Sequence, residues 1–113
     1  MTSFDVVLVP FPFTDLSAVK RRPCLVLASY RPKPLGEHVV LAMMTSQVSG
    51  HGFPWDVNLQ HASSAGLPKP TLVRLGKMVT LESKLVVKSL GSLHAQDRAA
   101  VRAEFVRLFR ALV

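Results

Sequence analysis

The sequence has few cysteines, few acids and no long apolar run, and each shortage narrows what the chain can be. Of its 113 residues only Cys24 is a cysteine, so no disulfide can form within the chain. No uncharged apolar stretch approaches the ~20 residues that a membrane-spanning helix needs. The first residues carry no basic leader and are interrupted by Asp5, Pro10 and Pro12, which argues against a signal peptide. We therefore expect a cytoplasmic protein with no membrane association.

Acidic residues are outnumbered two to one. The chain has seven Asp and Glu residues and 14 Lys and Arg residues, which gives a net charge of +7 with neutral histidines. Such a charge favours a polyanionic partner. Apolar residues make up 49% of the chain and are spread throughout, so the sequence predicts one folded domain over residues 1–113.

Short apolar runs bounded by Pro, Gly and polar residues predict β-strands. The first should end near Val9, because Pro10 has no N–H for a sheet, and the dozen residues that follow should form a loop. The other predicted strands are PCLVLAS, HVVLAMMTS, TLVRLGKMVTLES and KLVVKSL, with PWDVNL as an edge strand.

The character of the chain changes after Gly91. Apolar residues recur there with the spacing of an amphipathic helix: Val101, Phe105, Leu108, Phe109 and Leu112. Four arginines lie mostly off this stripe and indicate a solvated helix face rather than a nucleic-acid contact: Arg98, Arg102, Arg107 and Arg110. Five or six strands and one closing helix predict a small, strongly curved sheet or barrel in a mostly β, α+β domain.

A basic cluster of Lys20, Arg21 and Arg22 directly precedes Pro23. The proline pushes the backbone of Arg22 toward extended geometry, which would fix its guanidinium where loop becomes strand. A fixed guanidinium suits a phosphate, whereas the Lys20 ammonium is a point charge. The equal alternative is a solvated basic loop that protects a strand edge from aggregation.

Two further polar positions interrupt apolar strands. Thr45, followed by Ser46 and Gln47, ends one strand, where a hydroxyl most often serves a turn. Arg74 lies among apolar neighbours, so it either pairs with a carboxylate or lines a cleft. The acids available before the final helix are Asp5, Asp15, Glu37, Asp56 and Glu82.

The histidines offer a second route to acid–base chemistry. His51 and His61 flank FPWDVNL and could approach the same groove, although loop histidines are more often solvated. Phe53 and Trp55 could stack on a base or simply pack. Cys24 lies in an apolar strand, which favours an inert buried thiol. No His, Asp or Glu cluster has metal-ligand spacing and no glycine-rich phosphate loop is present, so we expect neither a metal nor a cofactor.

Four segments, in order, resemble the MazF/PemK toxins of bacterial toxin–antitoxin systems: FDVVLVPFPFTD, KRRPCLVLAS, VVLAMMTSQ and GLPKPTLVRLGKMVTLES. The resemblance implies an SH3-like barrel of the CcdB/MazF type, with about five to seven short strands and a C-terminal helix. It also implies a homodimeric, sequence-specific endoribonuclease, or mRNA interferase, that cuts single-stranded mRNA and is neutralised by an acidic cognate antitoxin.

The same resemblance assigns residues to the site. Arg22 matches the family's catalytic arginine, Thr45 its strand-end threonine, and Arg74 an active-site arginine of one branch. Around them we expect RNA contacts from Lys20, Arg21, Ser46, Gln47, His51, His61 and Lys77. Attack by the ribose 2′-hydroxyl on the adjacent phosphate would need no metal, and arginines suit the charge that develops on phosphorus but are poor bases, which predicts a slow enzyme.

Two positions depart from the family pattern. The branch with the second arginine carries an Asp two residues later, where this chain has Gly76, and many members carry a Glu where this chain has Ser17. Two alternatives therefore stay open. One is a gyrase-directed toxin of the CcdB type, whose C-terminal helix would contact the target, and the other is a degenerate member that binds RNA without cutting it.

Overall fold

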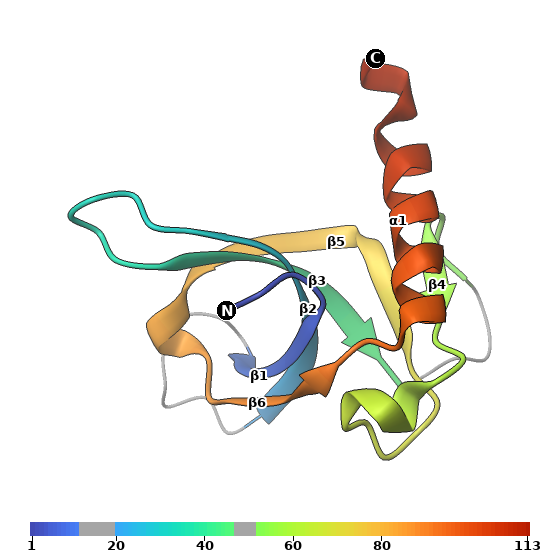
Figure 1. Ribbon diagram of the computed structural model, residues 1–113, viewed down its shortest axis with the longest axis horizontal. Coiled ribbons are helices and arrows are strands. Elements are labelled where there is room, and N and C mark those ends of the chain that lie inside the picture. Colours follow the sequence, from blue (N-terminus) through green and yellow to red (C-terminus); the bar gives the residue numbers. More distant parts are fainter. Residues whose placement is uncertain (12–19, 47–51) are drawn as a thin grey trace.

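Six antiparallel strands form one sheet in the order β4-β5-β3-β2-β1-β6 in the computed structural model of the chain (Figure 1). The structure describes residues 1–11, 20–46 and 52–113. The strands are β1 (Asp5–Phe11), β2 (Lys20–Tyr30), β3 (His38–Thr45), β4 (Asp56–Asn58), β5 (Leu72–Glu82) and β6 (Lys88–Ser92). Helix α1 (Ala95–Phe109) follows β6, and short 3₁₀ helices η1 (Ala62–Ala65), η2 (Ser83–Leu85) and η3 (Arg110–Leu112) connect or end elements. The mostly β fold with a C-terminal helix is confirmed.

The sheet curls into an open barrel, and α1 stands beside β4 and the bend of β5 (Figure 1). Because side chains alternate along a strand, neighbouring residues of β2 enter different cores: Leu25 packs with Val101 of α1, while Cys24 and Val26 pack in a second cluster with Leu41. Both faces of the central strands are therefore covered.

Strand β5 bends sharply where its register with β3 shifts. Met43 pairs with Arg74, but the adjacent Ala42 pairs with Met78, so β5 carries extra residues between these two positions. Such a bulge kinks a strand and redirects its side chains. Arg74 lies at the start of this bend.

The prediction that the first strand ends near Val9 is wrong, and so is the placing of Lys20 to Arg22 in a loop. Strand β1 continues through Pro10 to Phe11, and β2 begins at Lys20, with Phe11 opposite Lys20 and Val9 opposite Arg22. On its other side β1 pairs with β6 only as far as Leu8. The missing N–H of Pro10 is tolerated because this part of β1 is a sheet edge.

Helix α1 is confirmed, but only the beginning of its apolar stripe is buried. Val101 is 2% exposed, whereas Phe105 and Phe109 are 39% and 37% exposed and Leu112 is 79% exposed. The helix packs against the sheet through its first turns, and its C-terminal end extends away from the barrel (Figure 1). Arg98 does not fit the predicted solvated face, since its Nε donates to the carbonyl of Leu93 at 2.8 Å.

Two glycines let η1 lie directly on β6. Gly66 follows η1 with φ +77°, and a Cβ there would come within 2.1 Å of the carbonyl oxygen of Leu90. A Cβ on Gly91 would come within 2.8 Å of the Ala65 backbone. These backbone contacts admit only glycine and fix the segment that follows η1.

Helices long and apolar enough to cross a membrane are absent from the part of the chain that the structure describes.

Candidate functional site

The three predicted catalytic residues come from three neighbouring strands. Arg22 lies on β2, Thr45 ends β3 and Arg74 lies on β5. Met43 pairs with Arg74 on one side and with Cys24 on the other, and Arg22 and Thr45 lie two residues beyond that second pair, on adjacent strands. The sheet register therefore brings the three positions together.

Arg22, Thr45 and Arg74 line one cavity of about 480 Å³, together with Lys77. We call this cavity the arginine pocket. Its other walls are apolar side chains: Phe11, Met43, Met44, Met78 and Val79. Three cations line the pocket, and the described lining residues include no carboxylate, which suits the site to a phosphate.

Arg22 makes no ion pair with the residues that the structure describes. Its guanidinium carbon lies 5.0 Å from the centre of the Phe11 ring, an arrangement in which a cation is attracted to the ring face. Its Nε is buried and has no hydrogen-bond acceptor among the described residues. The charge of Arg22 is thus left available to the pocket.

Arg74 is held in the opposite way, by a bidentate ion pair with Asp56 of β4. Its Nε and Nη2 donate to the two carboxylate oxygens at 3.1 and 3.0 Å, and the two side chains are only 17% and 9% exposed. The Phe53 ring lies against the guanidinium, with 3.9 Å between the guanidinium carbon and the ring centre. The two roles weighed for Arg74 therefore both hold, since it pairs with a carboxylate and lines a cleft.

A second cavity of about 280 Å³, which we call the adjoining pocket, shares Arg22, Met44 and Thr45 with the arginine pocket. Lys69 and Ser46 add polar groups to it, and Arg21 is a further wall. Thr71 is buried and its hydroxyl donates to the Lys69 carbonyl at 2.9 Å, which holds this segment in place. Arg22 and Thr45 therefore line both the arginine pocket and the adjoining pocket.

The other predicted RNA-contact residues are scattered more widely. Lys77 lines the arginine pocket, whereas Lys20 is exposed at the start of β2 and lines neither cavity. His61 stacks on His94, with ring centres 3.8 Å apart, and its Nε2 lies 2.6 Å from Oε1 of Gln96. The structure therefore does not bring His61 to either pocket. Gln47, His51 and Ser17 lie outside the described residues.

Sequence reasoning missed Lys69 and did not identify Asp56 as the partner of Arg74. Lys69 lies between two prolines in GLPKP, at the start of a segment that carries the family resemblance, but the sequence predicted no role for Lys69 itself. Phe53, considered as a base-stacking residue, packs on Arg74 and also lies 5.3 Å from Nζ of Lys77. A pattern of apolar and polar residues contains no signal for such long-range partners.

Cys24 lines neither the arginine pocket nor the adjoining pocket. It is fully buried, as predicted, and burial raises the pKa of its thiol to about 12 despite the opposing effect of the Arg22 charge. The thiol stays protonated and unreactive at neutral pH.

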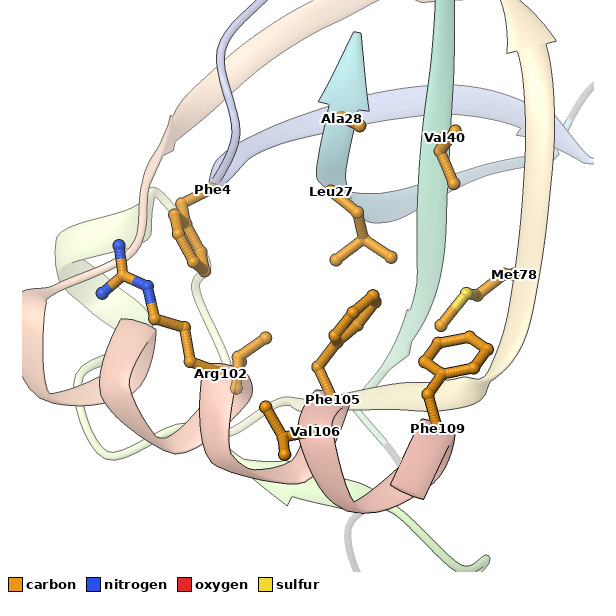
Figure 2. A pocket seen from close by; sticks show the side chains of 10 residues that line it. Phe4, Leu27, Ala28, Val40, Met78, Arg102, Phe105, Val106 and Phe109 are labelled. Carbon is orange, nitrogen blue, oxygen red and sulfur yellow. The ribbon is translucent and has the colours of Figure 1, made fainter. Parts of the chain in front are cut away.

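A third cavity, of about 490 Å³, is apolar and lies between α1 and the sheet. Figure 2 shows Phe4, Leu27, Phe105 and Phe109 pointing into it, with Arg102 at its rim. Its lining lacks the cluster of cations that a phosphate needs, so it is separate from the proposed chemistry. Across residues 1–11, 20–46 and 52–113 no three His, Cys, Asp or Glu side chains lie close enough to hold a metal ion.

Comparison with protein families places the chain. Residues 2–109 match the model of the PemK-like, MazF-like toxins of type II toxin–antitoxin systems, and the chain belongs to this family. Comparison with curated protein sequences gives no match.

Solved structures agree with this fold. The Mycobacterium tuberculosis toxin MazF-mt6 is 20% identical, with a TM-score of 0.70 over 94% of this chain and 96% of that one. A mycobacterial endoribonuclease in complex with its cognate antitoxin is 14% identical, with a TM-score of 0.72 over 97% and 95%. The MazE–MazF complex of Deinococcus radiodurans is 22% identical, with a TM-score of 0.68 over 96% and 94%.

Proposed function

We propose that this toxin is a metal-independent endoribonuclease that cuts single-stranded RNA by attack of a ribose 2′-hydroxyl on the adjacent phosphate. The observation that carries the proposal is the convergence of Arg22, Thr45 and Arg74 from three strands on one pocket. Family membership supports it, and one structural relative is a mycobacterial endoribonuclease.

The reaction makes a bond between the 2′-oxygen and phosphorus and breaks the bond from phosphorus to the 5′-oxygen. The 2′-hydroxyl loses its proton to water, the departing 5′-oxygen gains one from water, and the products end in a 2′,3′-cyclic phosphate and a 5′-hydroxyl. Arg22 and Arg74 stabilise the negative charge that builds on the phosphate oxygens, and the hydroxyl of Thr45 orients the phosphate. Neither arginine can act as a general base at neutral pH, so the enzyme is expected to be slow.

In this proposal the RNA would run through both pockets. Since Arg22 and Thr45 line both, the phosphate to be cut would lie between them, with one flanking nucleotide in each pocket. Lys77 would contact the RNA on one side, and Arg21, Ser46 and Lys69 on the other. Contacts from Lys20, Gln47, His51 and His61, and the sequence specificity of cleavage, remain predictions from the sequence.

The expected partners follow from charge and family. A net charge of +7 favours both RNA and an acidic antitoxin, and two structural relatives are complexes with their antitoxins. We propose a cognate acidic antitoxin, a homodimer and a bacterial cytoplasmic location for this chain as well.

One observation favours the gyrase-directed alternative, namely the exposed apolar end of α1. Phe105, Val106 and Phe109 are 39%, 59% and 37% exposed, as a helix that contacts a protein target would be. In that case the pocket arginines would be dispensable for toxicity.

Incubation of the purified protein with a long single-stranded RNA tests the proposal. Cleavage should persist in excess EDTA and yield 2′,3′-cyclic phosphate ends. It should stop when the nucleotide on the 5′ side of the cut has a 2′-deoxy sugar, while binding to that RNA survives and weakens with added salt. Cleavage of the deoxy substrate, or activity that EDTA removes and magnesium restores, would replace this mechanism. Binding without cutting would indicate the degenerate alternative, and neither activity the gyrase-directed one.

A further inference from the structure

Asp56 does more than neutralise Arg74, because the same carboxylate also organises the turn before β4. Its Oδ2 accepts the backbone N–H of Phe53 at 3.1 Å, and its own N–H donates to the Phe53 carbonyl at 3.3 Å. These bonds close the turn from Phe53 to Asp56. One carboxylate therefore fixes both the edge of the guanidinium and the aromatic ring that covers its face.

The turn itself has an unusual backbone. Trp55 has φ +65°, a conformation that a bulky residue rarely adopts and that the surrounding bonds must enforce. The turn lies over the bend of β5 at Gly76, where a Cβ would be 3.7 Å from both the Pro54 carbonyl oxygen and Cε3 of Trp55. Both are ordinary van der Waals distances, so the turn packs closely on β5 at this position. The contact lies two residues beyond Arg74, the partner of Asp56.

We propose that Asp56 is the positioning residue for Arg74. The proposal rests on the proposed RNA cleavage. Nε and Nη2 of Arg74 are committed to Asp56, and the described residues provide no acceptor for Nη1. Arg74 also lines the arginine pocket, so Nη1 is the nitrogen left to bind a phosphate there.

The ion pair also gives Arg74 and Arg22 different roles in RNA binding and cleavage. Asp56 cancels most of the charge of Arg74, so Arg74 should add little to the overall attraction for RNA and more to the orientation of the phosphate during the reaction. Arg22, which has no ion pair among the residues described, should contribute to both. Loss of Asp56 should consequently slow cleavage without weakening the binding of RNA.

The first test is Asp56→Asn, which keeps the shape of the side chain and removes its charge. Single-turnover cleavage should slow about 10-fold or more. The dissociation constant for an RNA with a 2′-deoxy sugar at the cut should stay unchanged or fall, because the protein loses one negative charge. Glu104→Gln is the matched control, since Glu104 pairs with Arg107 at 3.1 Å on α1, outside both pockets, and its cleavage rate should equal that of the parent.

A double-mutant cycle separates positioning from a general structural effect. If Asp56 acts through Arg74, Asp56→Asn should slow the Arg74→Lys variant by less than 2-fold. Equal slowing in both backgrounds, an unchanged rate for Asp56→Asn, or a loss of RNA affinity parallel to the loss of rate would each overturn the proposal. Phe53→Leu removes the ring from the guanidinium and tests the same arrangement if Asp56→Asn does not fold.

An RNA-free measurement distinguishes failure of this proposal from failure of the proposed function. In ¹⁵N-labelled protein the Nε–H of Arg74 should exchange slowly with water, and the exchange should become fast in Asp56→Asn. If the parent cuts no RNA, the proposed function fails, and this exchange rate alone decides whether Asp56 fixes Arg74. Fast exchange in the parent would overturn the positioning role.

Discussion

Replacement of Arg22 by Ala should slow RNA cleavage about 10²–10³-fold and leave the free energy of unfolding almost unchanged. The structure provides the reason, because Arg22 makes no ion pair with any described residue and one of its nitrogens is buried without an acceptor. A partly buried arginine without an ion pair contributes little to stability, so the presence of Arg22 on β2 indicates a functional role.

The energies can be estimated term by term. Loss of the contact with Phe11, in which the guanidinium carbon lies 5.0 Å from the ring centre, should cost about 0.5–1 kcal/mol. Removal of the buried, unpaired Nε should raise the free energy of unfolding by about 1–3 kcal/mol. Loss of the packing of the Arg22 aliphatic stem should lower it and offset part of this gain. The net change should lie within about 1 kcal/mol. A donor to the developing charge is worth about 2.7–4 kcal/mol, which corresponds to a 10²–10³-fold slower cleavage.

Chemical denaturation and single-turnover cleavage of one RNA check the two parts together. Arg22→Lys serves as the control that keeps the charge, and it should recover little activity because an ammonium cannot reproduce the guanidinium fork. Destabilisation of Arg22→Ala by more than about 2 kcal/mol would show that Arg22 is a structural residue. Cleavage at the parental rate would show that the site has been placed wrongly.

Three further predictions concern other residues of the site. Arg74→Ala should both impair cleavage and destabilise the fold by about 2–3 kcal/mol in denaturation, because Asp56 is left almost buried without its partner; unchanged stability would contradict the importance of the ion pair. Thr45→Ala should slow single-turnover cleavage with an unchanged RNA dissociation constant, and equal losses of rate and affinity would mark Thr45 as a binding residue. At pH 8 the Cys24 thiol, with its pKa near 12 instead of 9.0, should react with iodoacetamide about 1000-fold more slowly than in unfolded protein, and rapid labelling of the native state would show that Cys24 is accessible.

The fold was largely predictable because its signals are local. β-branched runs and their boundaries located the strands, and the spacing from Val101 onward located α1. The errors have physical causes that no local pattern contains: Pro10 continues a strand because β6 leaves that side of β1 unpaired. Phe105 and Phe109 stay partly exposed because they line a cavity between α1 and the sheet and do not fill it.

The site was predictable only in part. Arg22 and Arg74 were conspicuous as charges beside or within apolar strands, and the family resemblance pointed to Thr45. The pairing of Arg74 with Asp56 depends on the neighbouring positions of β4 and β5, and the role of Lys69 depends on the seating of η1 on β6. The Arg74–Asp56 pair and the position of Lys69 both depend on contacts between distant parts of the chain. The spacing of apolar and polar residues along one sequence does not predict such contacts.

Because η1 packs directly on β6, the arginine pocket and the adjoining pocket can change independently of each other. Gly66 and Gly91 anchor the segment that carries Pro68 and Lys69, and this segment lines the adjoining pocket but not the arginine pocket. Substitutions at Pro68 or Lys69 can therefore reshape one wall of the groove while Arg74 and Asp56 keep their geometry. Under the proposed function, such substitutions would change the contacts to the nucleotides on one side of the cut and leave Arg22, Thr45 and Arg74 in place.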